Sequence, residues 1–317
     1  MKKLIRTLAL GCALLPFAQC SSISALGTPS AIAAEPAPAT AAAAVALSDV
    51  DPALWVVKDA DTTIYLFGTV HLLKPGLSWF DDGVKTAFDT SDELRIEVVL
   101  PDDPSSLAPL IIGKAVDQTG KTMSSRLTEA QRAAYTTGFA KLGLDTAQLE
   151  PLEPWFVSLQ ATMLLISKAG YQPNSGAEEV LKVAANGAGK PIKGLETVEE
   201  QFGFLDSAPE DEQIKGLMAI AEKSDEAMKS FDAIVESWSS GDVKKAGALL
   251  NEGMKESPKT AEILLYSRNK RWAEWIDNRL DQPGTVFIAV GAGHLAGKNS
   301  VQQYLGKRKV KVTRVKY

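Results

Sequence analysis

The only two histidines of this chain stand in the same local setting. His71 ends the tetrapeptide Gly68-Thr-Val-His71, and His294 ends Gly291-Ala-Gly-His294; each tetrapeptide directly follows an apolar run typical of a buried strand. Ligand sites in α/β proteins gather at the carboxyl ends of strands, and glycine lets the backbone approach a ligand closely. One such histidine alone could simply end a strand and have no chemical role. Because both histidines share the setting, we predict that they form one site.

The third member of this site is predicted in the strand-like run 93–99. Strand alternation places Arg95 and Glu97 on the same face, and a carboxylate in an apolar strand is costly unless a cation or a metal balances it. Two neutral imidazoles and a carboxylate are ligands that suit zinc, manganese or iron. We therefore predict a divalent metal ion held by His71, His294 and Glu97. An ion pair with Arg95 or another cation is the alternative explanation for Glu97.

Two further charged residues complete the candidate catalytic set, which comprises Glu97, Glu196 and Arg268. Glu196 follows the short apolar run 191–195 and opens a stretch typical of a helix start, where an acid also interacts favourably with the helix dipole. Arg268 lies in a long predicted helix and could stabilise developing negative charge, although a solvated helix face would also explain it. The sequence has neither the Gly-x-Ser-x-Gly elbow of serine hydrolases nor a phosphate-binding P-loop.

The elements that must position these residues are strands and helices, which the sequence pattern distinguishes. Apolar runs predict strands at 53–57, 62–67, 93–99, 191–195, 285–290 and 310–315. Amphipathic patterns predict helices at 78–90, 128–142, 154–168, 176–185, 211–229, 260–280 and 299–305. The sequence thus predicts an α/β domain whose central sheet is built from N- and C-terminal strands, with a large helical insertion between them.

The first fifty residues differ in composition from the rest. A basic start followed by an apolar run over residues 8–18 is typical of a secretory signal. Cleavage near residue 33 and lipoprotein processing before Cys20 are both open. We predict an exported protein of the periplasm or cell envelope, which contacts a membrane only through a lipid anchor at Cys20, if one is attached. The predicted organisation is a signal peptide at 1–33, an Ala/Pro-rich linker at 34–50 and one domain at 51–317.

Composition excludes several classes of function. The only cysteines are Cys12 and Cys20, both inside the predicted leader, so we expect no thiol nucleophile, thiolate metal ligand or disulfide in the exported domain. The formal net charge is −5, and an acidic surface repels nucleic acid and anionic lipid. The expected partner is a peptide or small-molecule substrate; the sequence does not define an oligomeric state.

Several short motifs, taken together, resemble one family. They are Leu54-Trp55, Tyr65-Leu-Phe-Gly-Thr-Val-His71, the strand around Glu97, Gly194-Leu-Glu-Thr197 followed by Glu200-Gln201, Arg268-Asn269 and Val290-Gly-Ala-Gly-His-Leu295. Through them the region 53–317 resembles the TraB/GumN family, which includes the animal TIKI proteases. The resemblance implies a fold related to erythromycin esterase and ChaN-like proteins. It also implies a metal-dependent hydrolase site on the two Gly-x-x-His motifs and a glutamate, roles that fall on His71, His294 and Glu97.

Three functional hypotheses follow. In the first, the protein is a metal-dependent hydrolase, a peptidase, in which the ion on His71 and His294 activates water while Arg268 stabilises negative charge. In the second, the same cleft binds a peptide, a pheromone or haem without turnover. In the third, the protein is a metal-free esterase with His71 as the base and Glu97 orienting the imidazole. Metal analysis separates the first hypothesis from the third.

Overall fold

The computed structural model describes residues 47–317. The predicted signal peptide, the alternative processing site at Cys20 and most of the predicted linker lie outside the described residues. At the end of that linker, β1 (Ser48–Asp49) pairs in parallel with β4 (Leu77–Ser78). Within residues 47–317, no helix combines the length and the apolar character that crossing a bilayer requires.

The main sheet has six strands in the order β6-β5-β7-β3-β2-β8. Their bounds are β2 (Leu54–Lys58), β3 (Thr62–Thr69), β5 (Glu93–Val98), β6 (Ile192–Glu196), β7 (Gly284–Gly291) and β8 (Val312–Arg314). Strands β6, β5, β7 and β3 run parallel, whereas β2 is antiparallel to both β3 and β8. Strands from the two ends of the chain are therefore neighbours in one mixed sheet, with β3 beside β7 and β2 beside β8.

Burial explains which strands lie in the middle of the sheet. In β7 every residue from Val286 to Gly291 is buried, as expected for a strand covered on both faces. A hairpin then adds β2 next to β3, and its turn is closed by Asp59, whose carboxylate accepts a hydrogen bond from the Thr62 amide at 2.9 Å. The central strands thus form the rigid base from which the following loops emerge.

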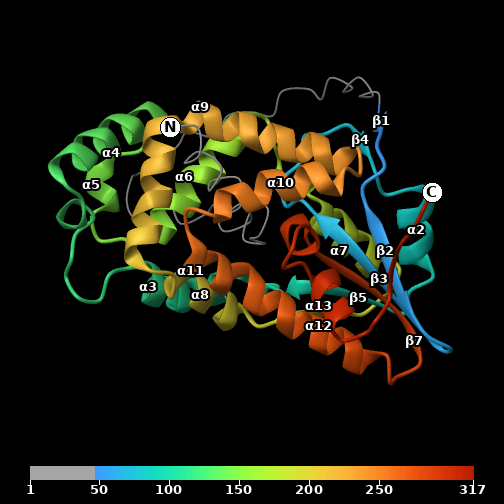
Figure 1. Ribbon diagram of the computed structural model, residues 1–317. Helices are drawn as coiled ribbons and strands as arrows, with labels where there is room; N and C mark the ends of the chain where they lie inside the picture. The colour runs from blue at the N-terminus through green and yellow to red at the C-terminus, as the bar shows by residue number, and fades with distance from the viewer. Residues whose placement is uncertain (1–46) are drawn as a thin grey trace.

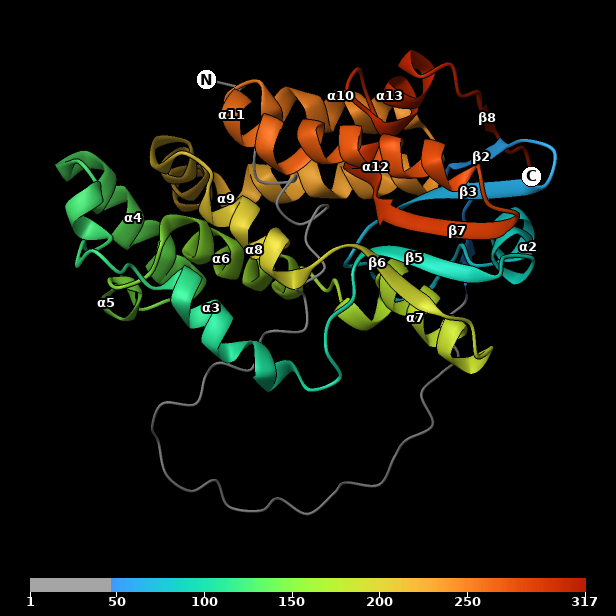
Figure 2. The ribbon, with the colours of Figure 1, turned by 90° about the horizontal axis from the view of Figure 1, so that it is seen from below.

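Helices cover both faces of the sheet and form a separate lobe at one end (Figures 1 and 2). The helices of eight or more residues are α2 (Asp82–Asp89), α3 (Ala108–Ala115), α4 (Glu129–Leu142), α6 (Pro154–Lys168), α7 (Ala177–Gly187), α8 (Val198–Asp206), α9 (Glu210–Ser239), α10 (Val243–Met254) and α12 (Ser267–Arg279). The shorter ones are η2 (Pro104–Leu107), η3 (Ser124–Arg126), α5 (Thr146–Leu149), η4 (Pro173–Ser175), α11 (Pro258–Ala261), the π-helical turn η5 (Glu262–Tyr266), η6 (Ala292–Leu295) and α13 (Val301–Lys307).

Three hydrophobic clusters hold these layers together. Side chains of α2, α7 and the C-terminal part of α9 pack with the sheet in one cluster. Those of α12 and α13 pack with strand residues in another, on a different set of side chains of β3 and β7. The helical lobe has a core of its own, formed by α4, α6 and the first half of α9. The sheet and the lobe are joined by α9, which contributes to both.

The structure confirms the α/β class, shows that the central sheet is mixed, and corrects several details. The helical residues form two segments rather than one insertion, because β6 pairs with β5 at the edge of the sheet and separates α3–α7 from α8–α12. Helix α2 begins at Asp82 rather than at residue 78, since Leu77–Ser78 pair with β1. Helices α3 and α10 were not predicted. The long helix predicted at 260–280 is interrupted by the π-helical turn at its start.

Candidate functional site

Four adjacent parallel strands end at one edge of the sheet, and each is followed or ended by a predicted site residue. Strand pairing aligns Thr69 of β3 with Gly291 of β7, so the two Gly-x-x-His motifs leave the sheet side by side. Glu97 lies near the end of β5, and Glu196 ends β6. The sheet therefore brings the predicted residues to the same edge, as parallel strands bring their carboxyl ends together.

His71 is held by a carboxylate that the sequence analysis did not identify. Its Nδ1 lies 2.7 Å from Oε1 of Glu178, in the first turn of α7, and the Thr69 hydroxyl donates a hydrogen bond to the same oxygen. The other ring nitrogen of His71, Nε2, is buried and has no hydrogen-bond partner among the described residues. A buried polar atom without a partner is uncommon and marks a position where a ligand or water can bind.

The pKa values of this pair shift toward the ionised forms. Burial alone would lower the pKa of His71, but the neighbouring Glu178 carboxylate opposes this, and the net pKa is raised above 6.5. Burial would raise the pKa of Glu178, but the His71 imidazole and the Thr69 hydroxyl lower it below its usual range. A histidine with a carboxylate on Nδ1 and a free Nε2 is the arrangement of a general base.

The loop that carries His71 lies tightly against the start of α7. The Val70 carbonyl accepts a hydrogen bond from the Ala177 amide at 2.9 Å. A Cβ on Gly176 would come within 1.9 Å of the His71 carbonyl oxygen, so only glycine fits there. The close approach of the two backbones is what places Glu178 beside the imidazole.

Arg268 occupies the centre of a second group of side chains. Its Nε donates to both oxygens of Glu196 at 3.0 Å, and its Nη2 donates to Glu97 at 2.6 Å and to Glu196 at 2.8 Å. All three side chains are at most 3% exposed. Burial would lower the pKa of Arg268, but the two carboxylates raise it above its usual value. Arg268 is therefore a buried cation shared by two acids and not part of a solvated helix face.

The remaining hydrogen bonds of the two carboxylates are also filled. The amide of Gln201 donates to Glu97 at 3.2 Å and to Glu196 at 3.0 Å, and the Gly291 amide donates to Glu97 at 2.7 Å. On its other side Glu196 accepts from the Trp272 indole at 3.1 Å and from the partly exposed Arg271 at 3.0 Å. Such complete pairing offsets the cost of burying two acidic side chains together.

The π-helical turn before α12 also contacts this cation. Within it, the Leu264 carbonyl accepts a hydrogen bond from Nη1 of Arg268 at 2.9 Å. Turns of this kind often occur at functional sites because they change the direction in which following side chains project. Here the turn supplies an oxygen that fixes one end of the guanidinium.

His294 is completely buried and has a neutral partner. Its Nδ1 lies 2.5 Å from the Asn269 Oδ1, and the Asn269 amide in turn donates to the Asn299 carbonyl at 2.7 Å. That second bond fixes the Asn269 oxygen as the atom that accepts a proton from the imidazole. Burial first, and the Arg268 charge second, hold the pKa of His294 well below 6.5. The ring is therefore neutral, with its Nε2 lone pair facing Arg268 at 3.3 Å.

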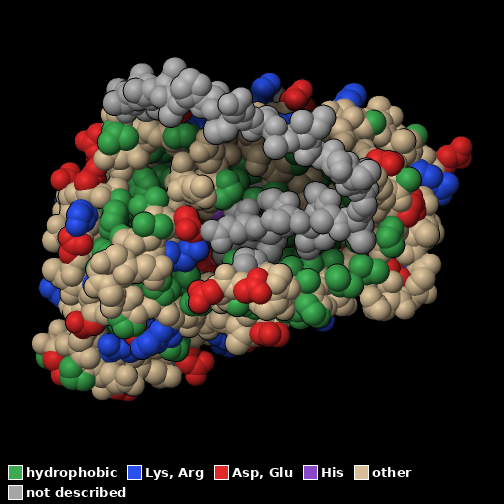
Figure 3. Space-filling model, turned by 180° about the vertical axis from the view of Figure 1, so that it is seen from behind, with side chains coloured by type: hydrophobic (Ala, Val, Ile, Leu, Met, Phe, Trp, Pro, Cys, Tyr) green, Lys and Arg blue, Asp and Glu red, His purple; other side chains and the backbone are tan. Residues whose placement is uncertain are grey.

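The two histidine groups form one electrostatic unit. The charges of Glu97 and Arg268 both act on His71, and His71 acts on His294. His71 retains 5% of its surface whereas His294 retains none. On the face shown in Figure 3 a histidine side chain is visible near the centre, beside acidic and basic side chains and surrounded by hydrophobic ones. His71 therefore keeps the little exposed surface that the two residues have, although its Nε2 is buried.

The predicted metal site can be tested against this geometry. His294 Nε2 and Glu97 Oε1 lie 3.6 Å apart, and both are atoms that bind divalent metals. However, Arg268 Nη1 is 3.3 Å from the same nitrogen, so an ion there would lie against a guanidinium. Within residues 47–317, no three histidine, cysteine, aspartate or glutamate side chains converge as a metal requires. In this arrangement the residues do not fit a divalent ion.

Sequence reasoning named five of the charged site residues and missed one. It named His71, His294, Glu97, Glu196 and Arg268, which the structure gathers at one edge; Arg95, one cation considered for Glu97, pairs with Glu93, and the cation beside Glu97 is Arg268. Gln201 and Asn269 were noted only as parts of motifs, without their hydrogen bonds to the carboxylates and to His294, and Glu178 was missed. A signal for Glu178 exists, since it lies three and seven residues before the buried Leu181 and Ala185, on the apolar face of α7.

Fold and site together define an α/β protein with a buried histidine–carboxylate centre at the carboxyl edge of its parallel strands. The model of the TraB/PrgY/gumN family matches residues 53–314, so the chain belongs to this family. An uncharacterised protein of Treponema pallidum is 24% identical over 275 residues, covering 81% of this chain and 80% of that protein. The uncharacterised protein YbaP of Escherichia coli is 22% identical, covering 80% and 92%. A protein of Amphimedon queenslandica described as a metalloprotease TIKI homolog is 24% identical, covering 83% and 61%. No solved structure matches the chain significantly.

Proposed function

We propose that this protein is a hydrolase of ester or amide bonds in which His71 is the general base. The observation that carries the proposal is the buried, unpartnered Nε2 of His71, whose other ring nitrogen is held by Glu178 at 2.7 Å. An imidazole fixed in this way has its basic nitrogen aimed at a substrate or water.

The residues suggest the following sequence of steps. Nε2 of His71 takes a proton from water as the water oxygen attacks the carbonyl carbon. Glu178 keeps its hydrogen bond to Nδ1 and stabilises the imidazolium that forms. The positive charge of Arg268, which also acts on His71, favours the negative charge that develops on the carbonyl oxygen through its field, since its N–H groups are already hydrogen-bonded. As the bond to the leaving group breaks, His71 returns the proton to the leaving oxygen or nitrogen.

A peptide bond is the substrate bond that the comparisons favour. The Amphimedon relative is described as a metalloprotease, and its similarity covers 83% of this chain. The fold proposed from the resemblance, related to erythromycin esterase and ChaN-like proteins, would extend the range to esters. We include export to the periplasm or cell envelope in the proposal, where such a hydrolase would meet extracytoplasmic peptides.

The decisive experiment compares wild type with His71→Ala on a peptide library read by mass spectrometry and on nitrophenyl esters. Loss of a general base lowers the rate by about 10²–10⁴-fold. Free imidazole should restore part of the activity of His71→Ala, while imidazole added to wild type should change nothing. An unfolding curve for each protein confirms that the variant is folded. Equal activity in both proteins would overturn the proposal.

A metal-depletion arm distinguishes this proposal from the metal-dependent hypothesis. Protein dialysed against a chelator should keep its activity, because the residues derived above supply the base and the positive charge. Loss of activity on chelation that zinc, manganese or iron restores would instead support a metal held by His71, His294 and Glu97. Stoichiometric binding of a peptide or haem without any product would favour the binding-protein hypothesis.

A further inference from the structure

An open cavity of about 290 Å³ at the surface lies beside the turn that carries His294. Turn η6 directs His294 into the buried site, whereas the next residue, Leu295, lines this cavity. Trp55 of β2 and Arg314 of β8, which are paired across the two strands, form another part of its wall. The volume lies near the lower limit of small-molecule sites, roughly 300 Å³. None of the proposed catalytic residues lines the cavity.

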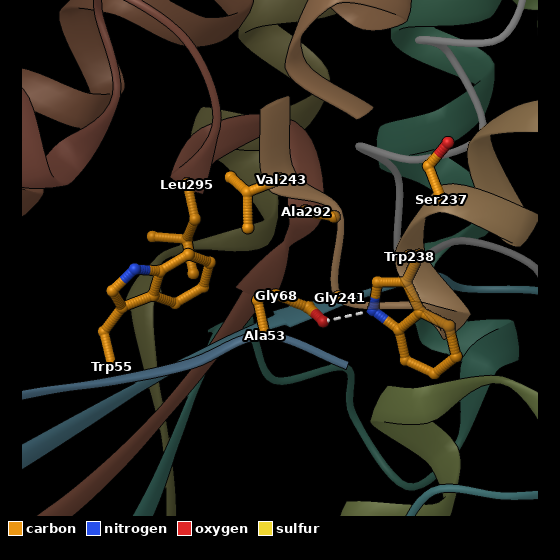
Figure 4. Close-up of a pocket in the computed structure, with 9 residues that line it drawn as sticks. All are labelled: Ala53, Trp55, Gly68, Ser237, Trp238, Gly241, Val243, Ala292 and Leu295. Atoms are coloured by element: carbon orange, nitrogen blue, oxygen red, sulfur yellow. Dashed lines mark hydrogen bonds between the residues drawn. The ribbon is translucent and has the colours of Figure 1, made fainter. Parts of the chain in front are cut away.

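One wall of the cavity is apolar and flat. Trp55, Val243 and Leu295 line both this cavity and a neighbouring pocket of about 20 Å³. In Figure 4, Leu295 and Val243 lie next to the indole of Trp55. An indole flanked by aliphatic side chains favours a planar or apolar group of a ligand.

Arg314 supplies a positive charge to the cavity. Its guanidinium lies over the Trp55 ring, 5.3 Å from the ring centroid, and its Nη1 donates to the Gly241 carbonyl at 3.3 Å. Gly241 has a φ of +61°, and a Cβ there would come within 2.7 Å of the Arg314 Nη2. In the part of the chain that the structure describes, no carboxylate forms an ion pair with Arg314. The backbone thus fits around a guanidinium whose charge has no acidic counterpart.

A buried acceptor completes the polar groups of the cavity. The amide nitrogen of Gln302 donates to the Leu295 carbonyl at 3.0 Å. Its Oε1 is buried and has no hydrogen-bond partner within residues 47–317. Leaving such an oxygen unpaired costs free energy, and a rotation of the side chain toward the cavity would let an N–H donor of a ligand remove that cost.

We propose that this cavity is a binding site for a small carboxylic acid with an apolar planar body and an N–H group, of the class of N-acylated aromatic amino acids. The carboxylate would pair with Arg314, the planar group would lie against the apolar wall formed by Trp55, Val243 and Leu295, and the N–H would donate to Gln302. The inference does not depend on hydrolysis at His71.

Isothermal titration with N-acetylphenylalanine tests the site, and its uncharged amide serves as the matched ligand. We expect the acid to bind wild type at least tenfold more tightly than the amide, because a charged hydrogen bond to arginine is strong. Arg314→Gln should weaken binding of the acid about tenfold or more and leave binding of the amide unchanged. Lys311→Gln, which removes an exposed cation outside the cavity, should bind both ligands as wild type does.

His71→Gln separates this site from the hydrolytic one. Because His71 does not line the cavity, the variant should bind the acid with wild-type affinity even if it has lost all turnover. Equal affinity for acid and amide, wild-type binding by Arg314→Gln, or absence of binding by wild type would each overturn the proposal. Loss of binding in His71→Gln would place the ligand in the other site and overturn it as well.

Discussion

The two histidines share a motif and differ in everything that surrounds them. His71 meets the carboxylate of Glu178, which raises its pKa, whereas His294 meets the amide of Asn269 and lies near a guanidinium, and its pKa is lowered. His71 has an unpartnered Nε2 and some exposed surface. His294 has neither an unpartnered ring nitrogen nor any exposed surface. One motif thus produces an imidazole paired with a carboxylate, with a raised pKa, and a neutral imidazole paired with an amide, with a lowered pKa.

The difference comes from the helices that supply the partners. Glu178 comes from α7, on one face of the sheet, and Asn269 comes from α12, whose neighbour Arg268 fills the space in front of His294. The strands therefore determine where each histidine emerges, and the helices determine its protonation. This division suggests changes that should make one histidine behave like the other.

Removal of the Arg268 guanidinium should have the largest effect on the free energy of unfolding. Arg268→Gln leaves Glu97 and Glu196 buried without their cation, and losing one partner of a buried ion pair costs about 3–5 kcal/mol. Urea unfolding monitored by circular dichroism measures the loss. The control Arg271→Gln removes a partly exposed guanidinium from the same Glu196 and should cost at most about 1 kcal/mol. Equal losses in the two variants would show that the buried position of Arg268 has no special energetic weight.

Exchanging the partners should exchange the behaviour of the histidines. Glu178→Gln removes the charge that raises the pKa of His71, so this pKa should fall, and hydrolysis should fall by about 10²–10⁴-fold if His71 is the base. Asn269→Asp puts a carboxylate on His294 and should raise its pKa. Imidazole NMR signals recorded against pH report both values, and with only two histidines one variant of each assigns them. Unchanged titration in either variant would contradict the partner argument.

The sequence predicted where the strands end better than what lies beside them. The apolar runs before Gly68 and Gly291 predicted β3 and β7, and the structure pairs these two strands in parallel so that their ends meet. Glu178 was not predicted because its helix looks like any amphipathic helix until it is docked against the His71 loop. Nor could the sequence show that Arg268, in a strongly polar helix segment, is buried: its burial depends on two carboxylates brought by other strands.

Stability should depend on pH in opposite ways around the two histidines. The pKa of His71 is raised above 6.5, so its pairing with Glu178 stabilises the fold fully below pH 6.5 and is lost as the pH rises through the raised value. The lowered pKa of Glu178 means that this contribution is also lost as the pH falls below about 4.5. His294 acts the other way: its stabilising neutral form is lost as the pH falls from 6.5 toward its lowered pKa.

Urea unfolding of wild type and Glu178→Gln, measured across this pH range, tests the predicted direction of the pH dependence of stability. The difference in unfolding free energy should be largest between about pH 4.5 and 6.5 and should shrink as the pH rises further. A difference that grows above pH 6.5 would mean that His71 is not protonated beside Glu178.

The smallest change should come from removing the Thr69 hydroxyl, which supports the pair formed by His71 and Glu178. Thr69→Val keeps the shape of the side chain and removes the hydrogen bond to Glu178. A hydrogen bond to a charged group contributes about 1.5–3 kcal/mol, so the pKa of Glu178 should rise and the fold should lose stability within that range. Thr63→Val, in the same strand and partly exposed, is the matched control and should be close to neutral. Because Glu178 still holds Nδ1 of His71, the variant should keep more activity than Glu178→Gln. An equal loss of activity would mean that the hydroxyl, and not the carboxylate alone, orients the base.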